Sequence, residues 1–365
     1  TCALPILTKA ANRIAQHGNQ RLPAPKDIHT RTFLEEKTIT IPRMKSYEVA
    51  WERLKHFAKQ QKYPMSTLEQ VDAAAAWWMD VLFFEGEGVS GAMTMMAAIK
   101  HMRTDVPRLN ALVRCSRALR SFRRLAPPQA RVPIPYPMLA QMIMHIVSQL
   151  NQPMVGVHLA LTWSLCCRPG ESLKLKYRQL VAPNQVSRRW SVILSESSPI
   201  EGKSQPSKTH ELDEAVMIDH PYMQWLGMVL KHLKSKASSS QSVFDFDMAH
   251  VTKHWHLAAD ACGFHPHGIQ CVYQIRHGSA STDRLTQQRS VEELMKRGRW
   301  KSLSSLRRYE QGGRLSQVFG SLSAVQQKAA LKAEKQLPST LARCVGCSKL
   351  PNAASSLSFS PGLAD

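Results

Sequence analysis

Several residues in the C-terminal half of this chain have side chains suited to attack on a phosphodiester. Tyr309 follows Trp300 by nine residues and Arg276 by thirty-three, and Arg168 lies far upstream. An arginine donates two parallel hydrogen bonds and keeps its proton, so two arginines can hold both non-bridging oxygens of a phosphate. A tyrosine hydroxyl can attack the phosphorus and form a covalent phosphotyrosine. An indole N–H adds a hydrogen-bond donor without repelling the anion.

The segment 161–175, which reads LTWSLCCRPGESLKL, resembles the first arginine box of the tyrosine recombinases, the phage-integrase family. That box consists of an apolar helix followed by the pattern Arg-x-x-Glu-x-x-x-Leu. Here the three named positions are Arg168, Glu171 and Leu175.

Two later segments are similar to the remaining boxes of that family. YQIRHGS, at 273–279, resembles a box with the pattern His-x-x-Arg-His, whose last two positions are Arg276 and His277. GRWKSLSSLRRY, at 298–309, resembles the last box, in which Gly-x-His/Trp precedes the nucleophilic tyrosine by nine residues. The resemblance covers roughly residues 134–325, about half of the chain, and depends on the three boxes together.

The resemblance implies a role for each matched residue. Arg168 and Arg276 would hold the scissile phosphate, and Trp300 would add a donor. Tyr309 would attack the phosphorus and form a 3′-phosphotyrosine. The bond energy is then kept in the intermediate, so the resemblance implies neither a metal nor another cofactor.

Three further roles follow from the same resemblance. The family places a catalytic lysine on a β-hairpin between the first two boxes, where Lys208 fits and Lys203 is the alternative. This lysine would protonate the departing 5′ oxygen. Glu171 would orient a neighbouring donor or pair with Arg168. His277 would contact the phosphate or, as we expect, buttress Glu171.

One position departs from the family pattern. Tyr273 stands where the second box has its first histidine, a residue that assists proton transfer to or from the nucleophile. A tyrosine hydroxyl can donate or accept a hydrogen bond, but with an ordinary pKa of about 10 it is a poor base near neutrality. We expect activity that is retained but slowed, and a catalytically weak or inactive copy stays open as an alternative.

The charge of the chain favours a nucleic-acid partner. Lysine and arginine total 48 against 27 acidic residues, a net charge of +21 with histidine neutral. Such an excess is the electrostatic footprint of a protein that binds a phosphate backbone. We therefore expect double-stranded DNA as partner, with an affinity that falls as salt rises.

The pattern of apolar residues predicts a mainly α protein with a small antiparallel β-sheet. A first helix begins near Ser46, and a second begins at Ser66, where Ser66 and Glu69 form a capping box. Further helices are expected over 91–102 and 108–124. These four form a bundle that corresponds in position to the family's core-binding domain. Five prolines within 126–137 predict a linker to the catalytic domain.

The catalytic half is expected to contain helices over 138–150, 153–167, 221–235, 248–262 and 291–298. Strands are expected at 189–195 and 215–219, joined by the loop that carries the two candidate lysines. The predicted domains are a basic, loosely ordered segment 1–42, a core-binding domain 43–125, a linker 126–137, a catalytic domain 138–325, and a helix with a disordered tail over 326–365.

Lys203 and two sets of arginines are candidate DNA contacts. The helix over 108–124 carries Arg114, Arg117, Arg120 and Arg124, the first three at a spacing that puts them on one face. Arg307 and Arg308 come directly before Tyr309. For both sets a solvated helix face is the alternative interpretation.

Other motifs have plainer explanations. His250 and His254 have a metal-binding spacing but no third ligand nearby, and Cys344 with Cys347 is a single C-x-x-C, so no metal site is expected. The eight cysteines are irregularly spaced, which favours free thiols in a reducing compartment. Gly312 and Gly313 predict a flexible break after Tyr309. The amphipathic helix that follows would pack on its own domain or dock on a neighbouring subunit.

The sequence therefore predicts a DNA strand-exchange enzyme, an intracellular DNA-associated tyrosine recombinase that assembles as a tetramer on DNA. No run of about 18 apolar residues predicts a membrane span. Two rivals stay open: a DNA-binding relic of a mobile element that no longer cuts, and a type IB topoisomerase, which shares the chemistry but relaxes supercoils.

Overall fold

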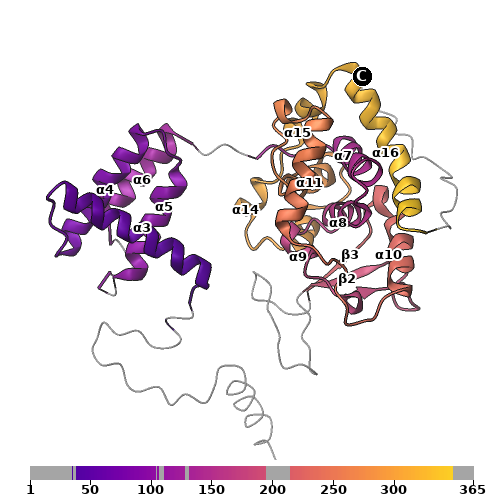
Figure 1. Ribbon diagram of the computed structural model, residues 1–365, viewed down its shortest axis with the longest axis horizontal. Coiled ribbons are helices and arrows are strands. Elements are labelled where there is room, and N and C mark those ends of the chain that lie inside the picture. The colour runs from indigo at the N-terminus through magenta and orange to yellow at the C-terminus, as the bar shows by residue number, and fades with distance from the viewer. Residues whose placement is uncertain are drawn as a thin grey trace, which may run out of the picture. The chain divides into compact units, whose positions relative to one another are not determined.

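The computed structural model describes residues 35, 38–103, 105–106, 111–127, 131–194 and 214–347 of the 365-residue chain. The chain divides into two compact units, 1–129 and 130–365, called here the N-terminal and C-terminal units. The described residues are mainly helical with one small antiparallel sheet, which confirms the predicted fold class at that level (Figure 1). Three predicted features lie outside the described residues: most of the segment 1–42, the candidates Lys203 and Lys208, and the tail after residue 347.

The N-terminal unit is a helical bundle. Its core contains Leu54, Val71, Met79, Met95 and Phe122, which are at most 3% exposed. Helix α3 packs on α5, and α4 packs on α6. The predicted apolar face of the first helix is confirmed in this core. The bundle consists of α3 (Ile41–Gln60), α4 (Leu68–Phe84), α5 (Val89–Met102) and α6 (Val113–Leu125).

The predicted capping box at the start of α4 is wrong by one residue. The N-cap is Thr67, whose side chain accepts from the main-chain N–H of Gln70 at 3.3 Å. The Gln70 side chain in turn accepts from the main-chain N–H groups of Ser66 and Thr67. Both registers contain a hydroxyl followed three residues later by an acceptor. Thr67 is the cap because it is the last residue with extended backbone before the helix.

Helix α6 obtains its N-terminal cap from another helix. Leu112 precedes it with a left-handed backbone and offers no capping side chain. The carboxylate of Asp72, in α4, accepts from the main-chain N–H groups of Arg114 and Cys115, each at 2.8 Å. A carboxylate suits this place because the first N–H groups of a helix are unpaired and partly positive. Asp72 is 8% exposed and links the two helices from within the unit.

The C-terminal unit is built on buried helices. Helix α8 (Pro153–Ser164) is buried on all sides from Val155 to its end, so it forms the centre of the core. It packs on α7 (Tyr136–Ser148) and α12 (Gln274–Leu285). Further helices are α9 (Pro169–Ser172), α10 (Leu226–Ser235), α11 (Met248–Ala261), α13 (Val291–Gly298), α14 (Leu303–Arg307), α15 (Gly312–Gly320) and α16 (Ala324–Cys344). Short 3-10 turns lie at Tyr177–Gln179, Pro221–Met223 and His265–His267.

The sheet has three described strands in the order β1 (Leu180–Val181), β2 (Ser191–Leu194) and β3 (Glu214–Met217). Both pairs are antiparallel, and Val192 lies opposite Val216 and Leu180. These three side chains are buried, whereas Met217 is 48% exposed, so one face of the sheet joins the core. The predicted strands β2 and β3 are confirmed with shorter bounds. The two-residue strand β1 was not predicted.

The segment after Tyr309 differs from the prediction. Gly312 and Gly313 do not break the chain but form the first turn of α15. Helix α16 packs along α7 of the same unit, with Leu337 and Leu341 fully buried (Figure 1). The apolar face of this helix is thus covered by its own chain, which is the first of the two predicted alternatives.

Within the described part of the chain, all seven cysteines are free thiols, as predicted. No helix among the described residues combines the length and the apolar composition needed to cross a membrane.

We predict that Asp72→Ala lowers the free energy of unfolding by about 2 kcal/mol, because two buried N–H groups lose a charged acceptor. Urea unfolding followed by circular dichroism measures the change. Asp80→Ala, on the exposed face of the same helix, is the matched control and should change stability by about 0.5 kcal/mol or less. Equal effects of the two substitutions would contradict a capping role for Asp72.

Candidate active site

The chain after α8 presents Arg168 at the start of α9. Cys166 ends the preceding turn with a left-handed backbone of φ 48°. Arg168 is the N-cap of α9, and its Nη1 donates to Glu171 Oε1 at 2.7 Å. The Glu171 carboxylate also accepts from the main-chain N–H of Arg168 at 2.9 Å. The Arg168 side chain is 24% exposed, so part of its charge faces solvent.

The buried side chain of His158 holds α9 in place through hydrogen bonds. His158 Nε2 lies 3.0 Å from the Pro169 carbonyl and 2.9 Å from Ser172 Oγ, which also meets Thr162 Oγ1 at 2.8 Å. Burial lowers the pKa of His158 to about 4, and the hydrogen bond to Pro169 offsets this only in part. The first box therefore rests on a neutral imidazole at pH 7.

Arg276, in α12, is completely buried. Its Nη1 donates to the Cys166 carbonyl at 2.9 Å, and its Nη2 donates to the Gly298 carbonyl. Its guanidinium lies 4.6 Å from the ring centre of Trp300 and 5.6 Å from that of Tyr309. Its Nε has no hydrogen-bond partner among the described residues. Arg276 thus joins the first box to the start of the last box, and each of its terminal nitrogens donates one hydrogen bond.

Trp300 lies directly against Gly298. A Cβ atom at Gly298 would be 2.0 Å from Cζ3 of the indole, so only glycine permits this approach. The indole is 8% exposed and packs in a small apolar cluster with Leu294 and Leu306. Its ring centre is 4.9 Å from that of Tyr309. The Gly-x-Trp spacing therefore places the indole beside both Arg276 and the tyrosine ring.

Tyr309 follows α14 and is held by its main chain. Its carbonyl accepts from Ser281 Oγ at 2.7 Å, and the same Oγ accepts from the main-chain N–H of Gln311. Its hydroxyl lies 3.2 Å from the hydroxyl of Tyr273. Both tyrosines are half-buried. The structure thus brings Tyr273, Arg276, Trp300 and Tyr309 together from three segments of the chain.

The Tyr309 hydroxyl is harder to ionise than a free phenol. Burial raises its pKa, and the hydrogen bond and charge of Tyr273 add to the increase. The charges of Arg276 and Arg168 act in the opposite direction and lower this pKa. The hydroxyl is neutral at pH 7, so an attack by this oxygen must release its proton to an acceptor.

The expected contact of His277 with Glu171 is not present. The ring of His277 packs at a tilt of 31° against that of Tyr309, with ring centres 4.3 Å apart. Burial lowers the pKa of His277 to about 4, with further lowering by Arg131 and Arg276, while the Arg308 carbonyl raises it. Its Nδ1 has no hydrogen-bond partner among the described residues. His277, in α12, therefore packs against the ring of Tyr309, which follows α14.

Two arginines that sequence reasoning missed complete this environment. Arg299 Nη2 donates to Glu171 Oε2 at 2.5 Å, in the place where His277 was expected. Arg131 lies with its guanidinium 4.8 Å from the ring centre of Tyr273. Arg299 has a left-handed backbone, which costs a non-glycine residue roughly 1–2 kcal/mol. No spacing rule singles out either arginine in a chain with 48 basic residues.

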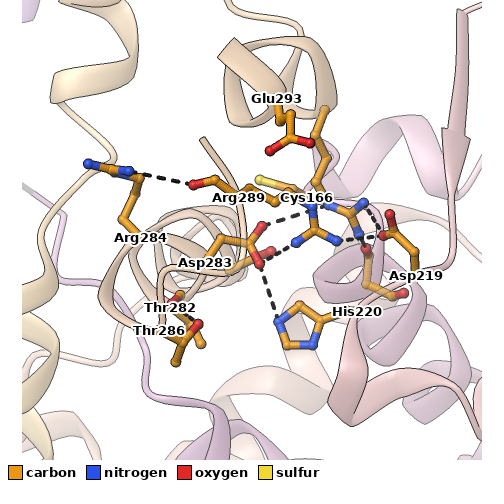
Figure 2. A network of polar contacts seen from close by, with 12 residues as sticks. Cys166, Asp219, His220, Thr282, Asp283, Arg284, Thr286, Arg289 and Glu293 are labelled. Carbon is orange, nitrogen blue, oxygen red and sulfur yellow. Dashed lines mark hydrogen bonds and ion pairs between the residues drawn. The ribbon is translucent and has the colours of Figure 1, made fainter. Parts of the chain in front are cut away.

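A buried ion-pair network lies behind the site and joins β3 to α12 and α13 (Figure 2). Arg289 donates to Asp283 and Asp219, at 2.5 and 2.6 Å. Arg297 donates to Asp219 at 2.6 Å and to the Ser164 carbonyl. His220 lies 3.5 Å from Asp283, which is fully buried. The network holds the strand beside the two boxes.

Charge and burial act on this network in opposite directions. Burial raises the pKa of Asp283, and Arg289 and Arg297 only partly reverse the increase. The same two arginines outweigh burial at Asp219 and lower its pKa. Burial lowers the pKa of His220 to about 3, and the neighbouring arginines contribute. His220 is therefore neutral at pH 7.

The remaining candidates lie apart from this cluster. Arg307 and Arg308 are exposed at the end of α14, next to Tyr309. In the N-terminal unit, α6 buries Cys115, Leu119 and Phe122 and exposes the predicted arginine stripe. That stripe, with all members exposed, comprises Arg114, Arg117, Arg120 and Arg124. Lys203 and Lys208 fall within 195–213, outside the described residues.

No group of three or more metal-ligating side chains occurs among the described residues. His254 Nδ1 instead meets the His250 carbonyl at 2.9 Å, a bond within α11. No family model matches the chain, and no curated protein matches it either.

We predict that the free energy of unfolding falls as pH drops from about 6.5 towards 4. In the folded state His158, His220 and His277 stay neutral over this pH range. In the unfolded chain the same three histidines become protonated, so the unfolded state binds more protons. Each histidine contributes up to about 1.4 kcal/mol per pH unit, and protonation of Asp283 offsets part of this loss. Urea unfolding at pH 7, 6 and 5 measures the slope.

His277→Gln is the matched variant for this slope, since it removes one of the three titrations. Its stability should depend less steeply on pH than that of the wild type. Stability that is constant or rises between pH 7 and 5 would contradict the neutral state of these histidines.

Proposed function

We propose that this chain cleaves and rejoins DNA strands through a 3′-phosphotyrosine on Tyr309, as a site-specific recombinase of the tyrosine type. One observation carries the proposal. The segments that resemble the second and last recombinase boxes meet at the Tyr309 side chain, and the charge of Arg168 from the first box also acts on its hydroxyl. Arg276 and Trp300 lie within 6 Å of its ring, and the Tyr273 hydroxyl is 3.2 Å from its own.

The geometry suggests a division of tasks. Arg168 is partly exposed and can donate to the non-bridging oxygens of a phosphate beside Tyr309. Arg276, beneath the ring, stabilises the phenolate as charge develops on the oxygen, because a buried cation acts strongly at low dielectric. The same charge makes the phenolate a better leaving group when a 5′ hydroxyl reverses the reaction.

The proton steps fall to neighbouring groups. As the Tyr309 oxygen bonds to phosphorus, its proton passes along the hydrogen bond to the Tyr273 hydroxyl, which gives up its own proton to solvent water. The bond from phosphorus to the 5′ oxygen breaks, and this oxygen needs a proton. We assign that task to Lys208, with Lys203 as the alternative. A tetramer on duplex DNA belongs to this proposal, because strand exchange requires two cleaved duplexes.

A DNA-binding relic that no longer cuts is the second candidate, and a specific observation favours it. Arg276 is fully buried, and both its terminal nitrogens donate to main-chain carbonyls. In this arrangement the guanidinium of Arg276 is shielded from solvent, and two of its five N–H groups are already used by the main chain. The two candidates differ in whether a covalent DNA adduct forms.

We predict that the wild-type chain forms a covalent adduct with nicked duplex DNA, and that Tyr309→Phe abolishes it while DNA affinity changes by less than about twofold. The nick lies just 3′ of a randomised cleavage region, so that the short strand released by cleavage diffuses away and traps the adduct. Denaturing electrophoresis detects the adduct, and peptide mapping by mass spectrometry locates it.

Tyr273→Phe is the matched control, since it removes the other hydroxyl of the pair. It should keep the adduct on Tyr309 and slow its formation by about a hundredfold, the lower end of what a positioned proton-transfer group contributes. An adduct that survives Tyr309→Phe would refute the assigned nucleophile. A wild-type chain that binds DNA but forms no adduct would establish the relic instead.

We also predict that replacing Arg114, Arg117 and Arg120 with glutamine weakens DNA binding and flattens its dependence on salt. The log–log slope should fall by up to about 0.9 for each arginine that neutralises a phosphate. Fluorescence anisotropy over a series of salt concentrations measures it. Replacing the exposed Lys328, Lys332 and Lys335 of α16 removes the same charge and is the control. Equal changes in slope would indicate a solvated face on α6.

A further inference from the structure

Arg299 is held in an unfavourable backbone conformation, although nothing in its chain position requires an arginine there. Its φ of 54° and ψ of 47° lie in the left-handed region, directly after α13. Glycine or asparagine occupies such a position with less strain. A side chain that persists in a strained conformation indicates that its surroundings determine it.

The side-chain contacts explain the conformation. The Arg299 side chain is 5% exposed. Its Nη2 donates to Glu171 Oε2 at 2.5 Å, and its Nη1 lies 3.4 Å from Glu214 Oε2. Arg299 therefore connects the last box to Glu171 of the first box and to the start of β3.

Glu171 is in turn the partner of Arg168. Its carboxylate accepts from the guanidinium of Arg168 at one oxygen and from Arg299 at the other. Burial by itself would raise the pKa of Glu171, and the charge of Arg299 is the largest influence that lowers it. When two guanidiniums share one carboxylate, the carboxylate neutralises less of the positive charge on each of them than it would on a single guanidinium.

We propose that Arg299 is a positioning residue for strand cleavage, which acts through Glu171 to fix the orientation of Arg168 and to leave part of its charge for the phosphate. This role rests on the proposed function. Without Arg299, Glu171 would pair with Arg168 alone, and the Arg168 fork would turn away from the phosphate it should hold.

The test compares Arg299→Ala, Arg299→Gly and Arg299→Lys in the full chain. Each is assayed for the rate of adduct formation in a single turnover on nicked duplexes of randomised sequence, for DNA affinity, and for the urea midpoint. Glycine relieves the backbone strain that alanine keeps, so Arg299→Gly should be the more stable of the two. Both should form the adduct at least about tenfold more slowly, at nearly unchanged DNA affinity.

Arg299→Lys should recover part of the rate, because a lysine can still contact one carboxylate. Gln287→Gly is the control for backbone strain. It removes another left-handed non-glycine residue, with φ 52°, at an exposed position. It should leave the adduct rate unchanged. A wild-type rate in Arg299→Gly would show that adduct formation does not need the Arg299 side chain, and would overturn the role.

A double-mutant cycle tests the route through Glu171. In a Glu171→Gln background, Arg299→Gly should slow adduct formation by less than about twofold, because the residue it acts through is already altered. The same slowing in both backgrounds would overturn the proposal and leave the proposed function intact. A wild-type chain without any adduct would refute the proposed function itself.

Discussion

The burial of the Arg276 guanidinium is the constraint on which the rest of the site depends. An arginine keeps its charge in proteins, and burying that charge without partners costs several kcal/mol. The Cys166 and Gly298 carbonyls supply two of the partners, and the rings of Trp300 and Tyr309 cover the charge. The ends of the first and last boxes must therefore lie where these carbonyls can meet one cation.

The ion-pair network around Asp219 and Asp283 has a comparable effect on the neighbouring elements. Each buried carboxylate has arginine partners, so the network is close to balanced in charge. Loss of one member would leave a buried charge uncompensated, which costs more than an intact pair gains. The network therefore fixes β3 and α12 in one arrangement beside the boxes. The ion pair of Arg299 with Glu171 likewise joins two segments of the site by pairing a largely buried charge.

Local sequence patterns gave reliable predictions where one element decides its own structure. The apolar pattern predicts a helix at α3 and the strands β2 and β3, because burial of one face and backbone sterics act within a few residues. The cap of α6 by Asp72 could not be predicted, since donor and acceptor are more than forty residues apart. The glycines at the start of α15 were misjudged, because packing against α12 outweighs their low helix propensity.

The types and spacing of the arginines, the tryptophan and the tyrosines identify from the sequence which residues could do chemistry. The helical class of the fold and the basic charge can be predicted in the same way. Which of these side chains meet depends on the packing of the helices and strands. The tertiary structure placed Tyr273 against the Tyr309 hydroxyl, gave Glu171 the partner Arg299 instead of His277, and buried Arg276 among carbonyls. The reason is that spacing along a chain constrains neighbours on one element, whereas contacts between elements depend on how all of their buried charges are satisfied together.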